Sequence, residues 1–239
     1  MPSIAEIRAQ VERQIPGALS VFKRSAPEVF PTGIAALDRE LGGIPKGALT
    51  QICSPAEITS GRTSMLVSLL AQVTGKEQVC AVVDATDCFD PESAEANGVC
   101  LSRLLWVRCS GSRMKAVEQA FKAADLLIQN GGFGIIAIDL GDVDEKLIRK
   151  IPLTTWFRFA RVMEPLPTAL VMLLPCPAAQ NCAALTLNVS ASAQWSGPGT
   201  LPHNRLLAKV ECKVEVVRTR TRKAVQGTRN NSTEISQGT

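Results

Sequence analysis

The chain has 239 residues, 46% of them hydrophobic, and a formal net charge of +4. That length is enough for one substantial hydrophobic core. Its apolar stretches are too short for a transmembrane helix and its N-terminus has no secretory pattern, so we expect a cytoplasmic protein without a membrane partner. Eight cysteines without a Cys-x-x-Cys pair, together with a single histidine, favour reduced, buried thiols. They argue against a zinc site, a haem site or a Ser-His-Asp hydrolase.

The positive charge is concentrated near the C-terminus. Between Arg218 and Thr239 there are five basic residues and one acidic residue, which gives +4 and leaves residues 1–217 neutral. A fold that binds DNA over a broad face normally carries more positive charge. Aromatic residues make up only 4% of the chain, which also disfavours stacking on bases. Contact with nucleic acid is therefore expected to depend on the C-terminal segment or on a local patch.

The first expected element is a short amphipathic helix. Ser3 and Glu6 form a capping-box pattern. Apolar residues recur behind it at helical spacing: Ile4, Ile7, Val11 and Ile15. This helix either folds back on its own domain or docks on a partner. We divide the chain into an N-terminal helix and linker (1–29), a core domain (30–218) and a basic C-terminal tail (219–239).

From residue 48 onward the sequence alternates between buried strands and helices. Continuous apolar runs predict strands that are covered on both faces, and helical periodicity predicts the helices between them. The expected strands are Ala48–Cys53, Val79–Asp84, Leu104–Arg108, Gly134–Asp139 and Ala169–Leu174. The expected helices are Thr63–Thr74, Glu92–Asn97, Ser112–Gln129 and Thr154–Met163. This order predicts an α/β fold with a mostly parallel sheet and helices on both faces.

The last part of the core has a different pattern. Apolar and charged residues alternate from Val210 to Val216, as they do in half-exposed strands. We therefore expect an antiparallel extension of one sheet edge. The segment from Thr219 onward is polar and lacks apolar periodicity, so it is expected to be disordered.

Residues 54–64 have features of a phosphate-binding P-loop. Such a loop holds phosphate with backbone N–H groups at a helix N-terminus, while a lysine reaches the terminal phosphates and a Ser or Thr hydroxyl holds Mg²⁺. The candidates for nucleotide binding are Ser60, Gly61, Arg62, Thr63 and Ser64. Arginine stands here in place of the lysine, and its planar guanidinium differs in geometry from an ammonium group. ATP and Mg²⁺ are therefore expected to bind only weakly.

A second candidate residue ends an apolar strand. Ile135-Ile136-Ala137-Ile138-Asp139 fits the strand that places an acid beside a P-loop to hold Mg²⁺ through water. Thr63 and Asp139 are therefore the expected Mg²⁺ contacts if a nucleotide binds. The alternative interpretation is an ordinary α/β sheet with a polar turn.

Three segments around the loop resemble the RecA family. They read Phe30-Pro31-Thr32-Gly33-Ile34-Ala35-Ala36-Leu37-Asp38, Leu41-Gly42-Gly43-Ile44-Pro45-Lys46-Gly47 and Asp84-Ala85-Thr86-Asp87-Cys88-Phe89-Asp90-Pro91. The resemblance covers about residues 30–222 and implies a RecA-like P-loop fold. The chain size, the Gly-Arg-Thr-Ser loop and the stretch from Pro152 to Arg161 are most similar to the ImuA family. Proteins of that family are RecA-like accessory proteins of inducible mutagenesis.

The departures from the RecA pattern concern catalysis. Arg62 replaces the lysine, Thr86 stands where RecA has the glutamate that positions the attacking water, and Cys176 stands where RecA has the glutamine that senses the γ-phosphate. Residues 177–181 form a much shorter loop than the DNA-binding loop of RecA. Phosphoryl transfer depends on positioning and charge stabilisation, so rapid ATP hydrolysis is not expected.

The resemblance implies a role in the DNA-damage (SOS) response and error-prone translesion synthesis. Implied partners are RecA, a polymerase-like protein of the ImuB type and an error-prone C-family polymerase, with single-stranded DNA as a further candidate. Arg218 and Arg220 align with RecA lysines that reach the nucleotide of a neighbouring subunit, so they are candidates for contacts in trans within a homo-oligomer. The alternative interpretation is that Arg218 and Arg220 are the first residues of a solvent-exposed basic tail. The alternatives are a divergent DNA-dependent ATPase or recombinase, and a regulator resembling a cell-division inhibitor.

Overall fold

The computed structural model describes residues 3–16, 28–55, 61–196, 206–219 and 232–237, and the side chains of 193–196, 206–210 and 232–237 are outside this description. The strands are β1 (Val29–Phe30), β2 (Ile44–Pro45), β3 (Ala48–Cys53), β4 (Val79–Asp84), β5 (Leu104–Arg108), β6 (Phe133–Asp139), β7 (Ala169–Leu174), β8 (Leu185–Ser196), β9 (Leu206–Thr219) and β10 (Ser232–Gln237). The helices are α1 (Ile4–Gln14), α2 (Ala35–Leu41), α3 (Arg62–Thr74), α4 (Pro91–Ala96), α5 (Arg113–Asn130), α6 (Glu145–Arg149) and α7 (Leu153–Met163), with short 3₁₀ turns η1 (Leu101–Arg103) and η2 (Gln180–Cys182).

A mostly parallel sheet organises the core. Its strand order is β10-β9-β8-β3-β7-β6-β4-β5. Neighbours from β8 to β5 run parallel, and the pairs β8–β9 and β9–β10 are antiparallel. This confirms the predicted α/β sheet with an antiparallel extension. One strand, β7, separates the loop-bearing strand β3 from β6, which carries Asp139.

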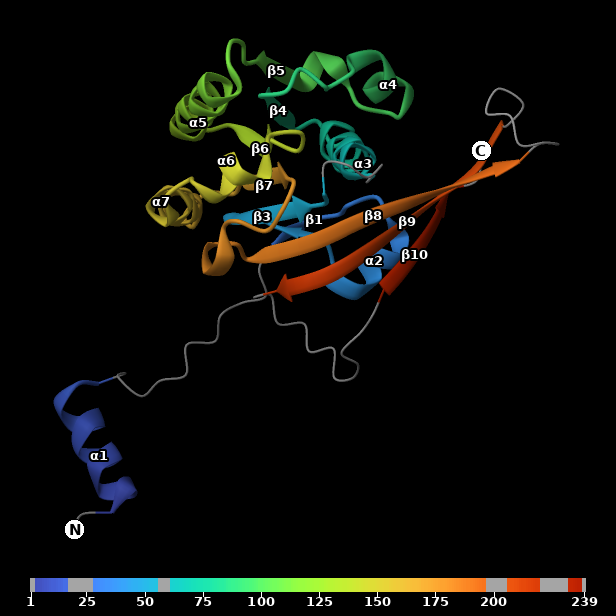
Figure 1. Cartoon of the computed structure of the whole chain (residues 1–239). Helices are drawn as coiled ribbons and strands as arrows, with labels where there is room; N and C mark the ends of the chain where they lie inside the picture. Colours follow the sequence, from blue (N-terminus) through green and yellow to red (C-terminus); the bar gives the residue numbers. More distant parts are fainter. Residues whose placement is uncertain (1–2, 17–27, 56–60, 197–205, 220–231, 238–239) are drawn as a thin grey trace.

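Helices cover both faces of the sheet (Figure 1). α5 and α7 pack on one face, where Trp156 and Phe159 are almost fully buried. α2, α3 and α4 pack on the other face around Leu37 and Leu66. Because the central strands are apolar on both sides, they remain buried only between these two helical layers.

The C-terminal segment differs from its sequence-based prediction. Residues 219–239 are expected to be disordered, yet Ser232–Gln237 forms β10, antiparallel to β9. The physical reason lies in β9, whose unpaired backbone groups would otherwise form an open sheet edge. Backbone pairing of this kind does not need the apolar alternation on which the prediction was based. Residues 220–231 lie outside the described part of the chain.

The N-terminal helix has the predicted capping box. The Ser3 side chain accepts from the Glu6 amide, and the Glu6 carboxylate accepts from the Ser3 amide at 2.7 Å. None of the residues of α1 is buried, and Figure 1 shows the helix apart from the sheet. Its apolar residues therefore have no contact with the core.

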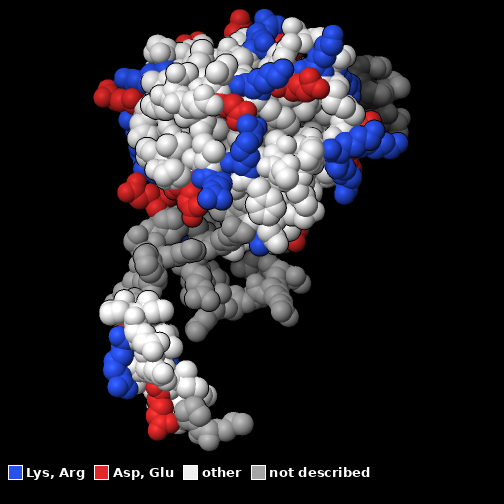
Figure 2. Space-filling model, turned by 90° about the vertical axis from the view of Figure 1, so that its left-hand side faces the viewer, with Lys and Arg blue, Asp and Glu red and all other residues white. Residues whose placement is uncertain are grey.

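The surface of the core is mixed in charge on the face shown in Figure 2, where basic and acidic side chains are interspersed with uncharged ones. Among the described residues, α7 exposes three large apolar side chains, Leu153, Phe157 and Val162, with 56% of the Phe157 surface accessible. No helix in the described ranges is long and apolar enough to cross a membrane.

Candidate functional site

The candidate site is formed where β3, β7, β6 and β4 end. Sheet register sets Cys53 beside Leu174, and Asp139 beside both Leu173 and Asp84. The carboxyl ends of these parallel strands therefore lie along one edge of the sheet. In open α/β sheets this is the edge at which ligands bind.

The P-loop enters α3 through a glycine. Gly61 has φ +73°, a left-handed conformation that glycine adopts without steric cost. A Cβ at this position would lie 2.8 Å from Sγ of Cys212 on β9. Backbone conformation and space therefore both favour glycine here. The predicted contact Ser60 lies within 56–60, outside the described residues.

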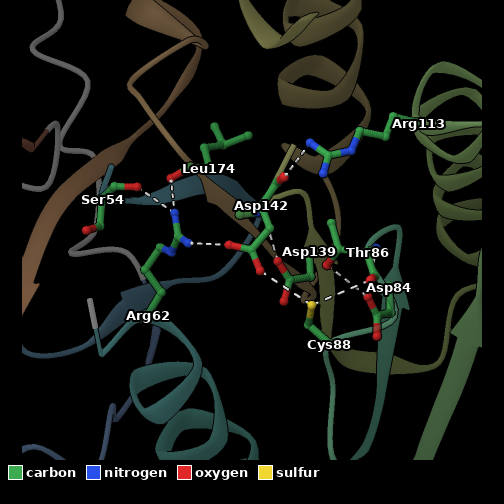
Figure 3. A network of polar contacts seen from close by, with 10 residues as sticks. Ser54, Arg62, Asp84, Thr86, Cys88, Arg113, Asp139, Asp142 and Leu174 are labelled. Atoms are coloured by element: carbon green, nitrogen blue, oxygen red, sulfur yellow. Dashed lines mark hydrogen bonds and ion pairs between the residues drawn. The ribbon is translucent and has the colours of Figure 1, made fainter. Parts of the chain in front are cut away.

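Arg62 is the first residue of α3, and its side chain is only 6% exposed. One guanidinium nitrogen, Nη1, donates to the carbonyl oxygen of Ser54 and to that of Leu174, the latter at 3.2 Å. The other, Nη2, donates to Oδ1 of Asp142 at 3.1 Å. Figure 3 shows the three partners around the guanidinium. Arg62 thereby joins the ends of β3 and β7 to the loop after β6.

This arrangement depends on the shape of arginine. A guanidinium offers five N–H donors in a rigid plane, which can serve separate acceptors at once, whereas an ammonium acts as a compact point charge. The glycine after β6 also matters, because a Cβ on Gly141 would lie 3.0 Å from the Arg62 guanidinium. The P-loop pattern indicates Arg62 but not its partner Asp142, and the adjacent Gly141 is the one sign of that partner in the sequence.

Two buried carboxyl groups lie beside this network. Asp139 is 6% exposed and accepts from the Gly141 amide at 2.9 Å. Burial raises the pKa of Asp139 to about 6, although the nearby Arg62 charge lowers it. Asp84, fully buried on β4, accepts from the amide and hydroxyl of Thr86 at 3.0 and 3.3 Å, and from the Phe89 amide at 2.9 Å. Asp84 thus fixes the loop that follows β4.

The side chains of that loop have protein partners. The Thr86 hydroxyl donates to Asp84, and the Asp87 carboxylate receives two hydrogen bonds of 2.7 Å from Arg108, which lower the pKa of Asp87. The Cys88 thiol lies 3.4 Å from Oδ2 of Asp142 (Figure 3). Thr86 is a hydroxyl at the position where the RecA resemblance implies a glutamate.

The other candidate residues that the structure describes lie at the start of α3, after β7 and on β9. Thr63 and Ser64 are exposed in the first turn of α3. Cys176 is buried just after β7, and burial raises its pKa. Arg218 lies on β9, where it donates to Oδ1 of Asn181, and Arg220 lies outside the described residues.

Sheet register separates Arg218 from the P-loop within one chain. It pairs with Thr186, which pairs with Gln51, two residues before the end of β3. The structure therefore brings Arg62 and Asp139 together and places Arg218 level with Gln51, on β9, with β8 between it and β3. A contact of Arg218 in trans stays a prediction.

ATP with Mg²⁺ can be tested against these side chains. A phosphate-binding cation must be available to the ligand, but Arg62 is engaged with Ser54, Leu174 and Asp142. Burial raises the pKa of Asp139 to about 6, so this carboxyl group is mostly ionised at pH 7 and has the charge that a Mg²⁺ ligand needs. The Ser54 hydroxyl is buried without a hydrogen-bond partner among the described residues. In this arrangement the Arg62 guanidinium is held by protein acceptors instead of being presented to a phosphate.

Within the described ranges, no group of three or more His, Cys, Asp or Glu side chains gathers as metal ligands do. The positions of the loop, the helix start and the acid-bearing strand nevertheless show which class of protein domain this is. A loop leads through a left-handed glycine into a helix, and a buried acid ends a strand one removed from the loop strand. These features define an α/β domain of the P-loop class.

Comparison with known proteins identifies the family within that class. Residues 4–144 match the family model described as RecA N-terminal domain. "Protein RecA" of Methylococcus capsulatus is 39% identical over 114 residues, which cover 47% of this chain and 31% of the relative. "Protein RecA" of Rickettsia massiliae is 36% identical over 144 residues, covering 57% and 40% respectively. The chain belongs to the RecA N-terminal domain family, and its matched stretches span less than half the length of these relatives.

Proposed function

We propose that this chain is a RecA-fold accessory protein that acts by binding partners in the DNA-damage response rather than by hydrolysing ATP. The partners would be RecA, an ImuB-type polymerase-like protein and an error-prone C-family polymerase. The P-loop would be an inherited element with a structural role and weak nucleotide affinity. Family membership and the state of the P-loop support this proposal.

The engagement of Arg62 is the observation that carries the proposal. A nucleotide that recruited this guanidinium would have to break its hydrogen bonds to two carbonyl oxygens and its ion pair with Asp142. Each hydrogen bond to a charged group contributes about 1.5–3 kcal/mol. Binding energy spent in releasing Arg62 is unavailable for holding the triphosphate, so weak affinity and slow turnover follow.

The connection between β7 and β8 gives independent support. The Gln51 side chain is buried beneath it, and its Oε1 accepts from the amides of Ala178 and Ala179 at 2.9 and 2.8 Å. Cys176 and Cys182 are also buried at its two ends. This short connection packs onto the sheet instead of projecting from it, which disfavours a DNA-binding loop at this position.

The test combines turnover with partner capture. We expect the full chain to show no ATP hydrolysis with or without single-stranded DNA, and R62K to show none either because Thr86 still replaces the expected glutamate. The same protein should capture purified RecA. Turnover stimulated by single-stranded DNA and lost in D139N would instead establish the DNA-dependent ATPase and overturn the proposal. Capture of division proteins but not polymerases would indicate the cell-division regulator.

A further inference from the structure

A cleft of about 450 Å³ lies beside the Arg62 network, at the carboxyl ends of β4, β5 and β6. Its walls are residues 85–88, residues 109–111, the start of α5, and the pair Asp142 and Val143. Small-molecule sites commonly measure about 300–1,000 Å³. The space beside Gly61 and Ser64 at the start of α3 measures only about 20 Å³. Among the described residues, this cleft therefore has room for a small molecule and the α3 cavity does not.

The chain topology opens this cleft. After β4 the chain passes to α4, which packs on the same face of the sheet as α3. After the neighbouring strand β5 it passes to α5, which packs on the opposite face with α7. Loops that leave adjacent parallel strands toward opposite faces create the crevice in which α/β proteins bind ligands. Position and size thus both indicate a binding site.

Three charged side chains line the cleft, Asp87, Asp142 and Arg113, and each carboxylate is paired with an arginine outside the lining. Asp142 is paired with Arg62, and Asp87 is paired with Arg108. Arg113 forms no ion pair within the described residues, and it donates a long hydrogen bond of 3.5 Å to the carbonyl oxygen of Asp142. The charge of Arg113 is therefore the one that the lining does not balance.

The start of α5 has an unfavourable arrangement of charges for a helix. Its first turn has no acidic residue, contains Arg113 and Lys115, and receives no side-chain capping bond from Ser112. Cations near a helix N-terminus oppose the helix dipole and lower helix stability. Where a sequence departs from such helix-capping and charge preferences without a structural benefit, a functional site is expected. An anion in the cleft would balance these charges.

We propose that this cleft binds a small phosphorylated molecule, with its phosphate group on Arg113 and the rest of the molecule against Cys88 and Cys109. The guanidinium fork matches the geometry of phosphate oxygens, which explains arginine at this position. Asp142 connects the two regions, because its backbone accepts from Arg113 while its carboxylate binds Arg62. The ligand would thus lie on the far side of Asp142 from the P-loop. This site is independent of the partner-binding role proposed above.

Calorimetry on the full chain tests the site with three probes: inorganic pyrophosphate, AMP and ribose 5-phosphate. We expect R113Q to weaken binding of the preferred probe at least about tenfold, since it removes a charged hydrogen-bond donor. K122Q is the matched control, because Lys122 is an exposed cation on the same helix outside the cleft. T63A tests whether the probe instead occupies the P-loop. K122Q should bind as the unmodified chain does.

Thiol protection supplies a second measurement. Cys88 is exposed and lines the cleft, whereas the partly exposed Cys100 lies outside it. Bound probe should slow alkylation of Cys88 by iodoacetamide, leave Cys100 unaffected, and give no protection in R113Q. Preference for AMP, for ribose 5-phosphate or for pyrophosphate would identify the source of the phosphate. The proposal is overturned if none of the probes binds, if R113Q binds normally, or if T63A alone abolishes binding.

Discussion

At the scale of single residues, Arg62 accounts for the state of the P-loop. A buried cation must find compensating partners, because desolvation of a charge is costly. Arg62 finds them in two carbonyl oxygens at strand ends and in the half-exposed carboxylate of Asp142. The same contacts that compensate the buried charge also connect strands β3 and β7, so arginine has a structural effect that lysine would reproduce only in part.

We therefore expect R62M to lower the free energy of unfolding by about 2–4 kcal/mol, because it removes three charge-assisted hydrogen bonds, while the Leu174 carbonyl oxygen keeps its bond from the Ser54 amide. R62K should fall between R62M and the unmodified chain. Urea denaturation measures the change. R149M is the control, since Arg149 pairs with the exposed Glu145 one helical turn away, and its denaturation midpoint should not change. An R62M midpoint equal to that of R149M would contradict the structural role.

Asp139 gives a prediction for pH dependence. Its pKa is about 6 in the folded protein and 3.8 in the reference state, so the folded chain binds more protons between these values. Its contribution to stability is complete below pH 4 and is lost as pH rises through 6. D139N, which cannot ionise, should gain stability relative to the unmodified chain by up to about 3 kcal/mol between pH 4 and 7.

Urea denaturation across this pH range measures the difference between the two proteins. D87N is the control, because the pKa of Asp87 is lowered and this carboxyl group therefore ionises below the range from pH 4 to 7. Its stability curve should therefore run parallel to that of the unmodified chain. Parallel curves for D139N would show that the buried carboxyl group is ionised throughout.

At the scale of elements, the pairing of β10 with β9 is the feature that the sequence did not indicate. β9 has 14 residues, and β10 pairs with it from Ser232 to Gln237. A long unpaired edge strand invites pairing with other chains. A chain lacking residues 232–239 should therefore be less stable and should self-associate, whereas one lacking only residues 238 and 239 should not. Light scattering and urea denaturation measure both effects, and an unchanged monomer would show that β10 does not protect the edge.

The elements also show what a sequence can predict. Ala48–Cys53 and Ala169–Leu174 have the predicted bounds because a continuous apolar run between turn residues has few other stable conformations. The capping box of α1 formed because its hydrogen bonds are local. The direction of the Arg62 side chain was beyond prediction, since its acceptors at Leu174 and Asp142 lie 112 and 80 residues away. Such contacts depend on how the strands are ordered in the sheet.

At the scale of the whole molecule, the core is a closed unit with two extensions. The core buries apolar residues on both faces of the sheet, while α1 buries none. An amphipathic helix that leaves its apolar residues unburied can contact another protein. The helix and the segment after Thr219 are therefore the parts that we expect to recruit partners in the proposed function.

Truncation of these extensions tests that expectation. A chain lacking residues 1–16 should unfold like the full chain, because α1 contributes no buried residue, yet it should capture less RecA or polymerase-like partner in a pull-down. A chain lacking residues 220–239 should capture less than one lacking only residues 232–239, which is the control for the loss of β10. I7D should reproduce the effect of the first deletion, because Ile7 lies on the apolar stripe of α1. A9D adds the same charge on another face of the helix and should bind normally. Full capture by both truncated chains would exclude the extensions as contact sites and would leave the core surface to recruit partners.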